Sequence, residues 1–166
     1  MLFLVDTCFW KHIQDVFLET TIDLRLVFQR FRWGTTFLVV KELHNYHLDA
    51  FFPHQDHYLI PVSSEELSQS LKTLPFLREF DQADQSLIVA ALRDHHPILT
   101  DDHSLFRTGL SLGIEIMLLP HFSLFLVRAG EIDKRTVSRL LKFWEQHESF
   151  KKKELNEFKN ELQQIR

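Results

Sequence analysis

The chain has 166 residues, with 19 Lys or Arg against 23 Asp or Glu and a formal net charge of −4. This length suits one domain with its own core, and 45% apolar and 25% charged residues exclude a disordered or fibrous protein. The single cysteine, Cys8, excludes an internal disulfide and a cysteine-based zinc cluster, so we expect a cytoplasmic protein.

The N-terminal third opens with the apolar residues 2–5, which predict a short strand buried on both faces. Residues 7–18 favour a helix. Apolar residues then recur at three- and four-residue spacing over 24–31, which predicts an amphipathic helix that ends at Gly34. Residues 37–40 are apolar and β-branched, so they fit either a short strand or the buried first turn of a helix.

The middle of the chain begins with polar residues 54–57, which predict a loop, and continues with a second strand at 59–62. Ser63 precedes two glutamates, the pattern of an N-cap followed by an acidic first turn, so a helix is expected over 65–74. Apolar spacing predicts another helix over 84–95.

The remaining strands are expected at 98–100 and 113–118. Further helices are expected at residues 124–129, 134–147 and 151–164. Strands that alternate with helices predict an α/β fold with a central, mainly parallel sheet of four or five strands, flanked by helices and followed by C-terminal helices. A break near Gly130 divides a core domain, 1–130, from a helical extension, 131–166, that we expect to pack on it.

Carboxylates follow several of these apolar segments. Asp6 comes directly after the first strand, Asp101 and Asp102 come after the third, Glu42 lies two residues beyond segment 37–40, and Asp84 begins an apolar helix. Parallel sheets bind ligands beyond the carboxyl ends of their strands. Acids gathered there stay ionised together only around a cation, and Mg²⁺ or Mn²⁺ prefers such oxygen ligands. Taken alone, each acid also fits a helix cap, a turn or a solvated helix position.

Five motifs along the chain resemble those of the PIN-domain nucleases. They are Leu-Val-Asp-Thr-Cys at 4–8, Val-Val-Lys-Glu-Leu at 39–43, Ala-Asp-Gln-Ser-Leu-Ile-Val-Ala-Ala-Leu at 83–92, Ile-Leu-Thr-Asp-Asp-His-Ser-Leu at 98–105, and Gly-Ile-Glu-Ile-Met-Leu-Leu-Pro at 113–120. They occur in the family's order and span most of the chain. The resemblance implies a PIN-like three-layer fold over residues 1–130.

The resemblance also implies a metal-dependent endoribonuclease that uses Mg²⁺ or Mn²⁺. It assigns the metal-binding, catalytic carboxylates to Asp6, Glu42, Asp84 and one of Asp101 or Asp102. The usual family motif, Thr-x-Asp, selects Asp102, whereas some branches place the acid where Asp101 stands. Thr7 and Thr100 would orient the carboxylates by hydrogen bonds.

Many small members of this family are toxins of VapBC-type toxin–antitoxin pairs, so the expected partners are an RNA substrate, an antitoxin protein and a second copy of the chain. The alternative is a PIN-like scaffold that binds RNA or protein without cutting it. A DNA nuclease is not separable from a ribonuclease by sequence. The Gly-Glu-Ile that precedes the C-terminal helices resembles a PIN-like branch with extra C-terminal helices, whose function is mostly uncharacterised.

The C-terminal part differs in charge from the rest. Residues 128–166 carry 10 basic and 7 acidic side chains, whereas 1–127 carry 9 and 16. The basic side chains either track an RNA backbone or form a solvated helix face. Apolar residues including Phe143, Trp144, Phe150 and Phe158 either pack on the core or form a partner surface. Sixteen phenylalanines favour a partner surface, because they exceed what such a core is expected to need.

Other candidate sites are weaker. Ten histidines include no zinc-binding motif. His103, beside the Asp doublet, fits either a phosphate contact or an exposed loop residue. Cys8 has no marked base nearby, and we expect it to pack rather than react. No apolar stretch is long enough to span a membrane, and an N-terminus without a cationic start indicates no signal peptide.

Overall fold

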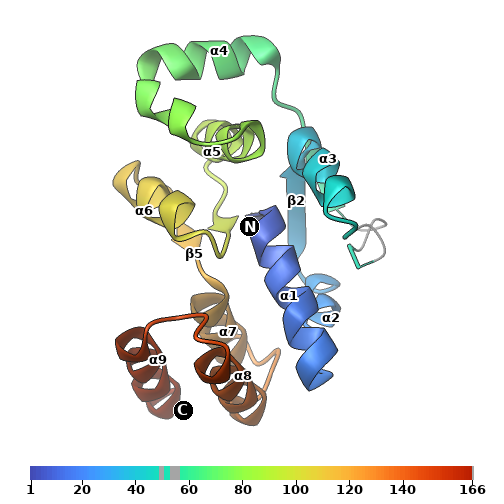
Figure 1. The fold of residues 1–166 in the computed structure, drawn as a ribbon, viewed down its shortest axis with the longest axis vertical. Helices are drawn as coiled ribbons and strands as arrows, with labels where there is room; N and C mark the ends of the chain where they lie inside the picture. The colour runs from blue at the N-terminus through green and yellow to red at the C-terminus, as the bar shows by residue number, and fades with distance from the viewer. Residues whose placement is uncertain (49–50, 53–56, 166) are drawn as a thin grey trace.

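Five parallel strands form one sheet in the order β3-β2-β1-β4-β5. In Figure 1, β2 and β5 are labelled among the surrounding helices. The structure, a computed structural model, describes residues 1–48, 51–52 and 57–165. The strands are β1 (Leu2–Val5), β2 (Arg32–Thr36), β3 (His57–Ile60), β4 (Ile98–Leu99) and β5 (Ile116–Met117). The predicted α/β fold with a central parallel sheet between helices, a three-layer PIN-like architecture, is confirmed. Most of the predicted loop 54–57 lies outside the described residues.

Helices connect the strands and extend the C-terminus. They are α1 (Thr7–Thr20), α2 (Arg25–Phe28), α3 (Phe37–Asn45), α4 (Ser64–Thr73), the 3₁₀ helix η1 (Pro75–Glu79), α5 (Gln82–Asp94), α6 (His103–Ser111), α7 (Leu119–Arg128), α8 (Lys134–Gln146) and α9 (Lys152–Gln164). Of the two structures left open for residues 37–40, the helical one is correct. Ser63 caps α4 in a capping box with Glu66, as its position before the glutamates predicts.

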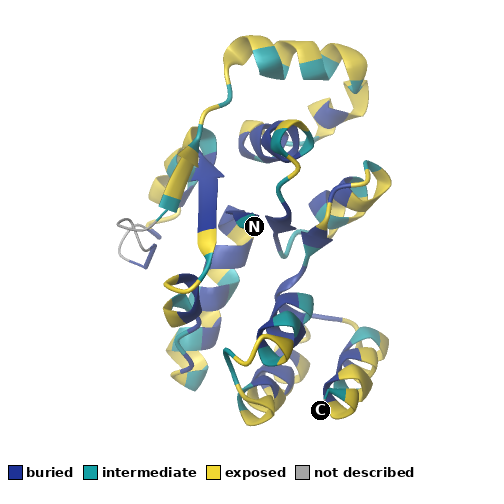
Figure 2. Ribbon diagram, turned by 180° about the vertical axis from the view of Figure 1, so that it is seen from behind, coloured by how far each residue is buried: buried dark blue, intermediate teal, exposed yellow. Residues whose placement is uncertain are grey.

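Both faces of the sheet are covered, which is why three consecutive residues of β1, Phe3, Leu4 and Val5, are buried. On one face, Phe3 contacts Phe122 of α7, and Trp33 of β2 contacts Trp10 of α1. On the other face, Thr36 of β2 hydrogen-bonds Ser86 of α5 with their Oγ atoms 2.5 Å apart, and α6 packs on β5. Figure 2 shows the buried residues concentrated along β2, α5 and the inward sides of α1 and α7.

The predicted helix over 24–31 is confirmed only in its middle, and its predicted end at Gly34 is wrong. Only α2 is helical there, and Gly34 lies inside β2. The reason is a close strand approach: a Cβ on Gly34 would lie 2.4 Å from the carbonyl oxygen of Tyr58 in the paired strand β3. Gly34 therefore permits pairing at the sheet edge and does not end a helix.

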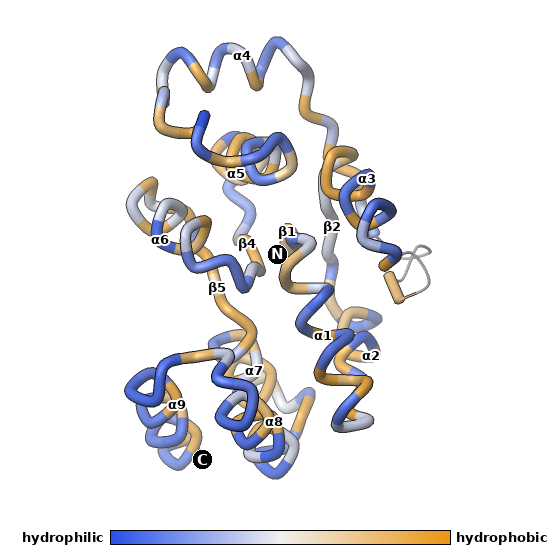
Figure 3. The backbone as a smooth tube through the Cα atoms, viewed as in Figure 1, coloured by the Kyte–Doolittle hydropathy of each residue, from blue (hydrophilic) through white to orange (hydrophobic). Residues whose placement is uncertain are grey.

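The C-terminal helices pack against the rest of the chain. Helix α8 contacts α1 and α7, and α9 contacts α7 and α8. Phe143, Trp144, Phe150 and Phe158 are buried by these contacts, so they pack on the core, and residues 131–165 expose no large apolar side chain. Figure 3 shows the same division, with apolar residues facing inward and a hydrophilic outer surface on α8 and α9.

The abundant phenylalanines serve the interior of this chain. Phe3, Phe9, Phe28 and Phe122 meet edge to face or tilted in one buried cluster. Among the described residues, Phe37 and Phe76 are the exposed phenylalanines. The phenylalanine content therefore gives no support for a partner surface. Within the same described ranges, no helix is long and apolar enough to cross a membrane.

Candidate metal centre

The candidate site lies at the point in the sheet where the strand order reverses, beside β1. The chain runs from β1 to β2 on one side, while β4 and β5 lie on the other side of β1. At this switch point the carboxyl ends of β1 and β4 adjoin, because the backbone N–H of Asp6 donates to the carbonyl of Leu99 over 3.0 Å. Parallel α/β sheets form their binding crevice at such a point.

Asp6 is turned toward the end of β4. It occupies the N-cap position of α1, yet its side chain makes no capping bond. Instead its Oδ2 accepts a 2.7 Å hydrogen bond from the Thr100 hydroxyl, and the side chain is 1% exposed. The alternative interpretation of Asp6 as a plain helix cap is therefore wrong.

Glu42 reaches the same place from α3. The backbone N–H of Val39 donates to Thr36 Oγ1, so α3 begins at the end of β2 and carries Glu42 in its second turn. The Thr7 hydroxyl, in the first turn of α1, donates to Glu42 Oε2 over 2.6 Å. Thr7 and Thr100 thus each hold one candidate carboxylate, as the resemblance implies.

Asp84 is contributed by the first turn of α5, but it is not that helix's cap. Asp81 is the N-cap, and its Oδ1 accepts the backbone N–H of Asp84 over 2.9 Å. Burial, followed by the charges of Asp6, Asp81, Asp102 and Glu42 in that order, raises the pKa of Asp84 to about 8. Asp84 therefore belongs electrostatically to one group with the other candidates.

Burial and neighbouring carboxylates also raise the pKa values of Asp6 and Glu42. Burial raises the pKa of Asp6 to about 7 against the opposing hydrogen bond from Thr100, with added repulsion from Glu42 and Asp102. Burial also raises the pKa of Glu42, and Asp81 adds to the rise. The carboxylates of Asp6, Glu42, Asp84 and Asp102 thus repel one another, which is the electrostatic condition that a bound cation relieves.

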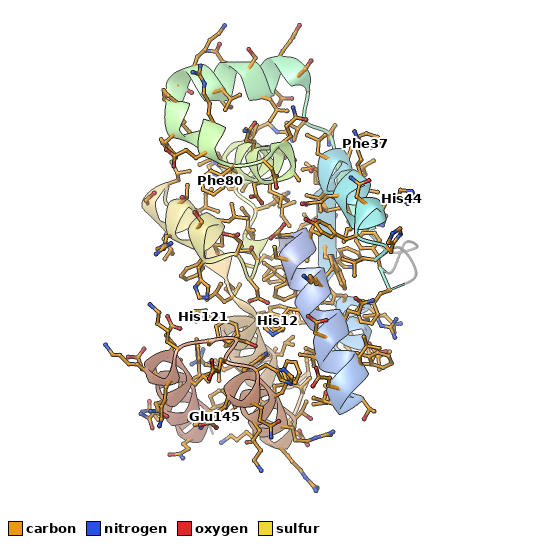
Figure 4. The ribbon with its side chains drawn as sticks, viewed as in Figure 1. His12, Phe37, His44, Phe80, His121 and Glu145 are labelled. Atoms are coloured by element: carbon orange, nitrogen blue, oxygen red, sulfur yellow. The ribbon has the colours of Figure 1, made fainter. Side chains whose placement is uncertain are left out.

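The two members of the Asp doublet have different roles. Side chains alternate along an extended segment, and Thr100 points toward Asp6, so the next residue points to the opposite side. Asp101 accordingly lies 2.7 Å from Nδ1 of His12, which Figure 4 labels on α1, and accepts the backbone N–H of Leu119 over 2.8 Å. Burial raises the pKa of Asp101, and His12 opposes the rise.

Asp102 lies on the same side of the segment after β4 as Asp6. Its Oδ1 caps α6 by accepting the backbone N–H groups of Ser104 and Leu105 at 2.6 and 2.7 Å. Its own N–H donates to Thr100 Oγ1 over 3.0 Å. Among the described residues no donor reaches Asp102 Oδ2. The structure thus brings together Asp6, Glu42, Asp84 and Asp102, and leaves Asp101 in the core.

Two neighbours of the site were not expected from the sequence. Asp81 joins the carboxylates, and its signal is the Asp-x-x-Asp spacing before an apolar helix, which fits a cap followed by a first-turn acid. Cys8 is exposed, so the predicted packing role is wrong. Partial burial and the carboxylates of Asp6, Asp102, Asp84 and Glu42 raise the pKa of the thiol, which disfavours a nucleophilic thiolate.

The donor set fits a hard divalent cation better than other groups. It consists of carboxylate oxygens with hydroxyl groups behind them, the ligands that Mg²⁺ and Mn²⁺ prefer. In this conformation no three His, Cys, Asp or Glu side chains among the described residues are arranged to hold one ion together. The fit therefore rests on donor chemistry and shared placement, not on a preformed cage.

No protein-family model matches the chain, and no curated protein gives a significant match. The resemblance to PIN-domain nucleases therefore stays a prediction from the motifs. What the fold and the site define is an α/β protein with a cluster of carboxylates at the switch point of a parallel sheet.

Proposed function

We propose that this protein is a metal-dependent endoribonuclease that hydrolyses RNA phosphodiester bonds with Mg²⁺ or Mn²⁺. One observation carries the proposal: Asp6, Glu42, Asp84 and Asp102 come from four separate segments and meet at the switch point of the sheet. Carboxylates that repel one another destabilise the fold, so their gathering at one place favours a functional role for them.

The roles of the residues follow from their contacts. The oxygens of Asp6, Glu42, Asp84 and Asp102 would hold the cation, with Thr100 and Thr7 fixing the orientation of Asp6 and Glu42. When bound, the ion supplies charge stabilisation at the phosphate and a water of lowered pKa. Asp81 adds negative charge beside Glu42 and Asp84, which favours a divalent cation over a monovalent one.

Partners and compartment belong to the same proposal. A cytoplasmic location agrees with the free thiol of Cys8. The proposed antitoxin and homodimer contacts have a candidate surface in the exposed apolar side chains of Phe37, Tyr58 and Leu59 on α3 and the edge strand β3. Several basic side chains of the extension are engaged within the chain, such as Arg128 with Glu161 and Arg139 with the carbonyl of Thr20.

The test is cleavage of end-labelled RNA and of DNA of the same sequence by the purified protein with Mg²⁺, with Mn²⁺ or with EDTA. We expect cation-dependent cutting of RNA that falls by about a hundredfold or more in Asp6→Asn and in Asp84→Asn. Asp15→Asn is the matched control, because Asp15 is exposed on α1 and lies outside the carboxylate group.

The outcomes separate the candidate functions. Equal loss in Asp15→Asn, or cutting that persists in EDTA, would contradict the proposed centre. Cutting of DNA but not RNA would make the protein a deoxyribonuclease that uses the same centre. RNA binding without cutting under any cation would favour the non-catalytic scaffold.

A further inference from the structure

A buried pair of side chains, His12 on α1 and Asp101 after β4, lies behind the carboxylate centre. Asp101 Oδ2 is 2.7 Å from His12 Nδ1, and the side chains of Asp101 and His12 are 8% and 13% exposed. An ionised carboxylate only accepts hydrogen bonds, so His12 Nδ1 carries the hydrogen and donates it. The pair thus engages the member of the Asp doublet that points away from the centre.

Each oxygen of the Asp101 carboxylate has its own donor. Oδ2 faces His12, and Oδ1 accepts the backbone N–H of Leu119 over 2.8 Å. Leu119 is the first residue of α7, whose N-cap residue makes no side-chain cap bond, so Asp101 supplies that bond from outside the helix. Without the His12 donor, Oδ2 would be buried with no other partner among the described residues, a cost that favours a turn of the side chain.

A turn of Asp101 disturbs the centre because the neighbouring residues share its backbone. The N–H of Asp102 donates to Thr100 Oγ1 over 3.0 Å, and the Thr100 hydroxyl donates to Asp6. The bonds of Asp101 hold the same segment from its opposite side. Ligands of one cation act together only when their oxygens are held to within about 0.5 Å of the productive geometry. The position of Asp102 therefore depends on both sets of bonds.

Aromatic side chains of the C-terminal extension surround the His12 ring. The ring of Phe150 stacks on it with an interplanar angle of 23° and centroids 5.7 Å apart, and Trp144 and Phe143 lie at 6.1 and 6.3 Å. In Figure 4, His12 lies where α1 meets the C-terminal helices. Its Nε2 is buried and has no hydrogen-bond partner among the described residues. Aromatic packing, and not a second hydrogen bond, therefore sets the orientation of the His12 ring.

Phe150 also contacts the other end of the doublet. Its ring meets that of His103 at 5.9 Å with an interplanar angle of 67°. His103 is the first residue of α6 and directly follows Asp102, the cap of that helix. One ring of the extension thus contacts both the partner of Asp101 and the neighbour of Asp102.

We infer that His12 is a positioning residue for the proposed metal ligand Asp102, that it acts through Asp101, and that the aromatic rings of the extension hold it in place. This rests on the proposed function. It makes the affinity of the centre for a divalent cation depend on α8 and on the connection between α8 and α9, which contribute none of the carboxylates.

The first experiment removes the donor and keeps the packing. His12→Phe leaves an aromatic ring beside Phe150 but no donor to Asp101, whereas His12→Asn replaces the ring by a side chain whose amide N–H can still donate. The Kd for Mn²⁺ is measured without RNA, by electron paramagnetic resonance of the free ion. Urea unfolding in EDTA measures the stability of each variant.

We expect the Kd for Mn²⁺ to rise by about tenfold in His12→Phe and to stay closer to the wild-type value in His12→Asn. An unchanged Kd in His12→Phe would overturn the inference. An equal rise in both variants would overturn the donor role of His12.

The second experiment changes the extension and leaves His12 in place. Phe150→Leu removes the ring that stacks on His12, and Phe158→Leu is the matched control, because Phe150 and Phe158 are both 6% exposed and Phe158 meets His121 instead. We expect a similar loss of stability in both variants and a raised Kd for Mn²⁺ in Phe150→Leu alone. Equal Kd values in the two variants would overturn the inference. This comparison also decides the question if His12→Phe does not fold.

Failure of this inference and failure of the proposed function give different results. Mn²⁺ binding that is weakened in His12→Phe, together with no RNA cutting by the wild type, supports the positioning role and overturns the nuclease. Cation-dependent RNA cutting with the same rate and the same Kd for Mn²⁺ in the wild type and His12→Phe overturns the positioning role alone. A wild type that neither binds Mn²⁺ nor cuts RNA overturns both.

Discussion

Thr100 donates its hydroxyl to Asp6 and accepts the backbone N–H of Asp102, so one fully buried side chain holds both strand ends of the centre. The doublet that follows is divided by the alternation of an extended segment. Asp101 turns to His12 and the start of α7, and Asp102 turns to the centre. The sequence leaves this choice open, because it does not show which side of the strand faces the crevice.

Thr100→Val tests this positioning role. The substitution keeps the shape of the side chain but removes the donor to Asp6, so we expect cation-dependent cleavage to fall by about 10–100-fold. The apparent affinity for Mn²⁺ should fall as well, which separates positioning from a general loss of folding. Thr108→Val, on α6 outside the centre, is the control. Full activity and unchanged Mn²⁺ affinity in Thr100→Val would remove Thr100 from the site.

The raised pKa of Asp84 predicts how stability depends on pH. The folded pKa is about 8 against an ordinary 3.8, so the folded state binds the proton more tightly than the unfolded chain. Without cation, stability from this group is full below pH 4 and is lost as pH rises through 8. Asp84→Asn resembles the protonated form, so its melting temperature in EDTA should exceed that of the wild type, with a gap that widens from pH 5 to 8.5.

If the difference in melting temperature between Asp84→Asn and the wild type stays constant from pH 5 to 8.5, Asp84 does not have the raised pKa. The control Asp15→Asn should have the melting temperature of the wild type at every pH. The stabilisation expected at pH 8 is on the order of 1–2 kcal/mol, since the side chain retains some contact with solvent.

Divalent cations should offset the repulsion between the ionised carboxylates of the centre. A cation present at ten times its Kd stabilises the folded state by about 1.4 kcal/mol, which raises the melting temperature by about 3–6 °C. We expect this shift with Mn²⁺ or Mg²⁺ for the wild type and its loss in Asp6→Asn/Asp84→Asn. Differential scanning fluorimetry with Ca²⁺ and Na⁺ as comparison ions measures it. No shift at millimolar Mn²⁺ would contradict the centre.

Among the single elements, the strands that consist of apolar residues are predictable from the sequence, and β2 is not. β1, β3, β4 and β5 each overlap an apolar segment of the sequence. β2 consists of Arg, Trp, Gly and two Thr, and it is stabilised by bonds that no hydropathy pattern reveals, such as Thr35 Oγ1 to the carbonyl of Val5. Its burial also depends on Gly34, whose contact with β3 is long-range.

Gly34→Ala tests that close approach. A methyl group there meets the Tyr58 carbonyl oxygen at 2.4 Å, and neither backbone can yield without separating β2 from β3. We expect a destabilisation of about 1–3 kcal/mol, measured by urea unfolding. The protein should lose amide-exchange protection first in β3, the edge strand. A variant as stable as the wild type would mean that the edge pairing is looser than the structure shows.

At the scale of the whole molecule, the carboxylate centre and the extension depend on one core. Phe150, in the connection between α8 and α9, stacks its ring on His12 with centroids 5.7 Å apart. His12 in turn contacts Asp101, the member of the Asp doublet that points away from the centre, so the extension contacts the pair that holds Asp101 in place. The sequence predicts the C-terminal helices by their periodicity. It does not predict which surface they cover, since that surface is formed by α1 and α7, which come from distant parts of the chain.

Trp144→Ala tests whether the extension folds with the rest. Trp144 is fully buried on α8, and its removal should cost about 3–5 kcal/mol, whereas Gln146→Ala on the exposed side of α8 should cost little. The remaining tryptophans, Trp10 and Trp33, lie in residues 1–130 and report on that part by fluorescence, while circular dichroism reports on all helices. If α8 and α9 are integral, both signals change together in urea at a lower midpoint. Loss of helical signal before the tryptophan signal would instead make the extension an independently unfolding unit that separates from residues 1–130 without unfolding the carboxylate site.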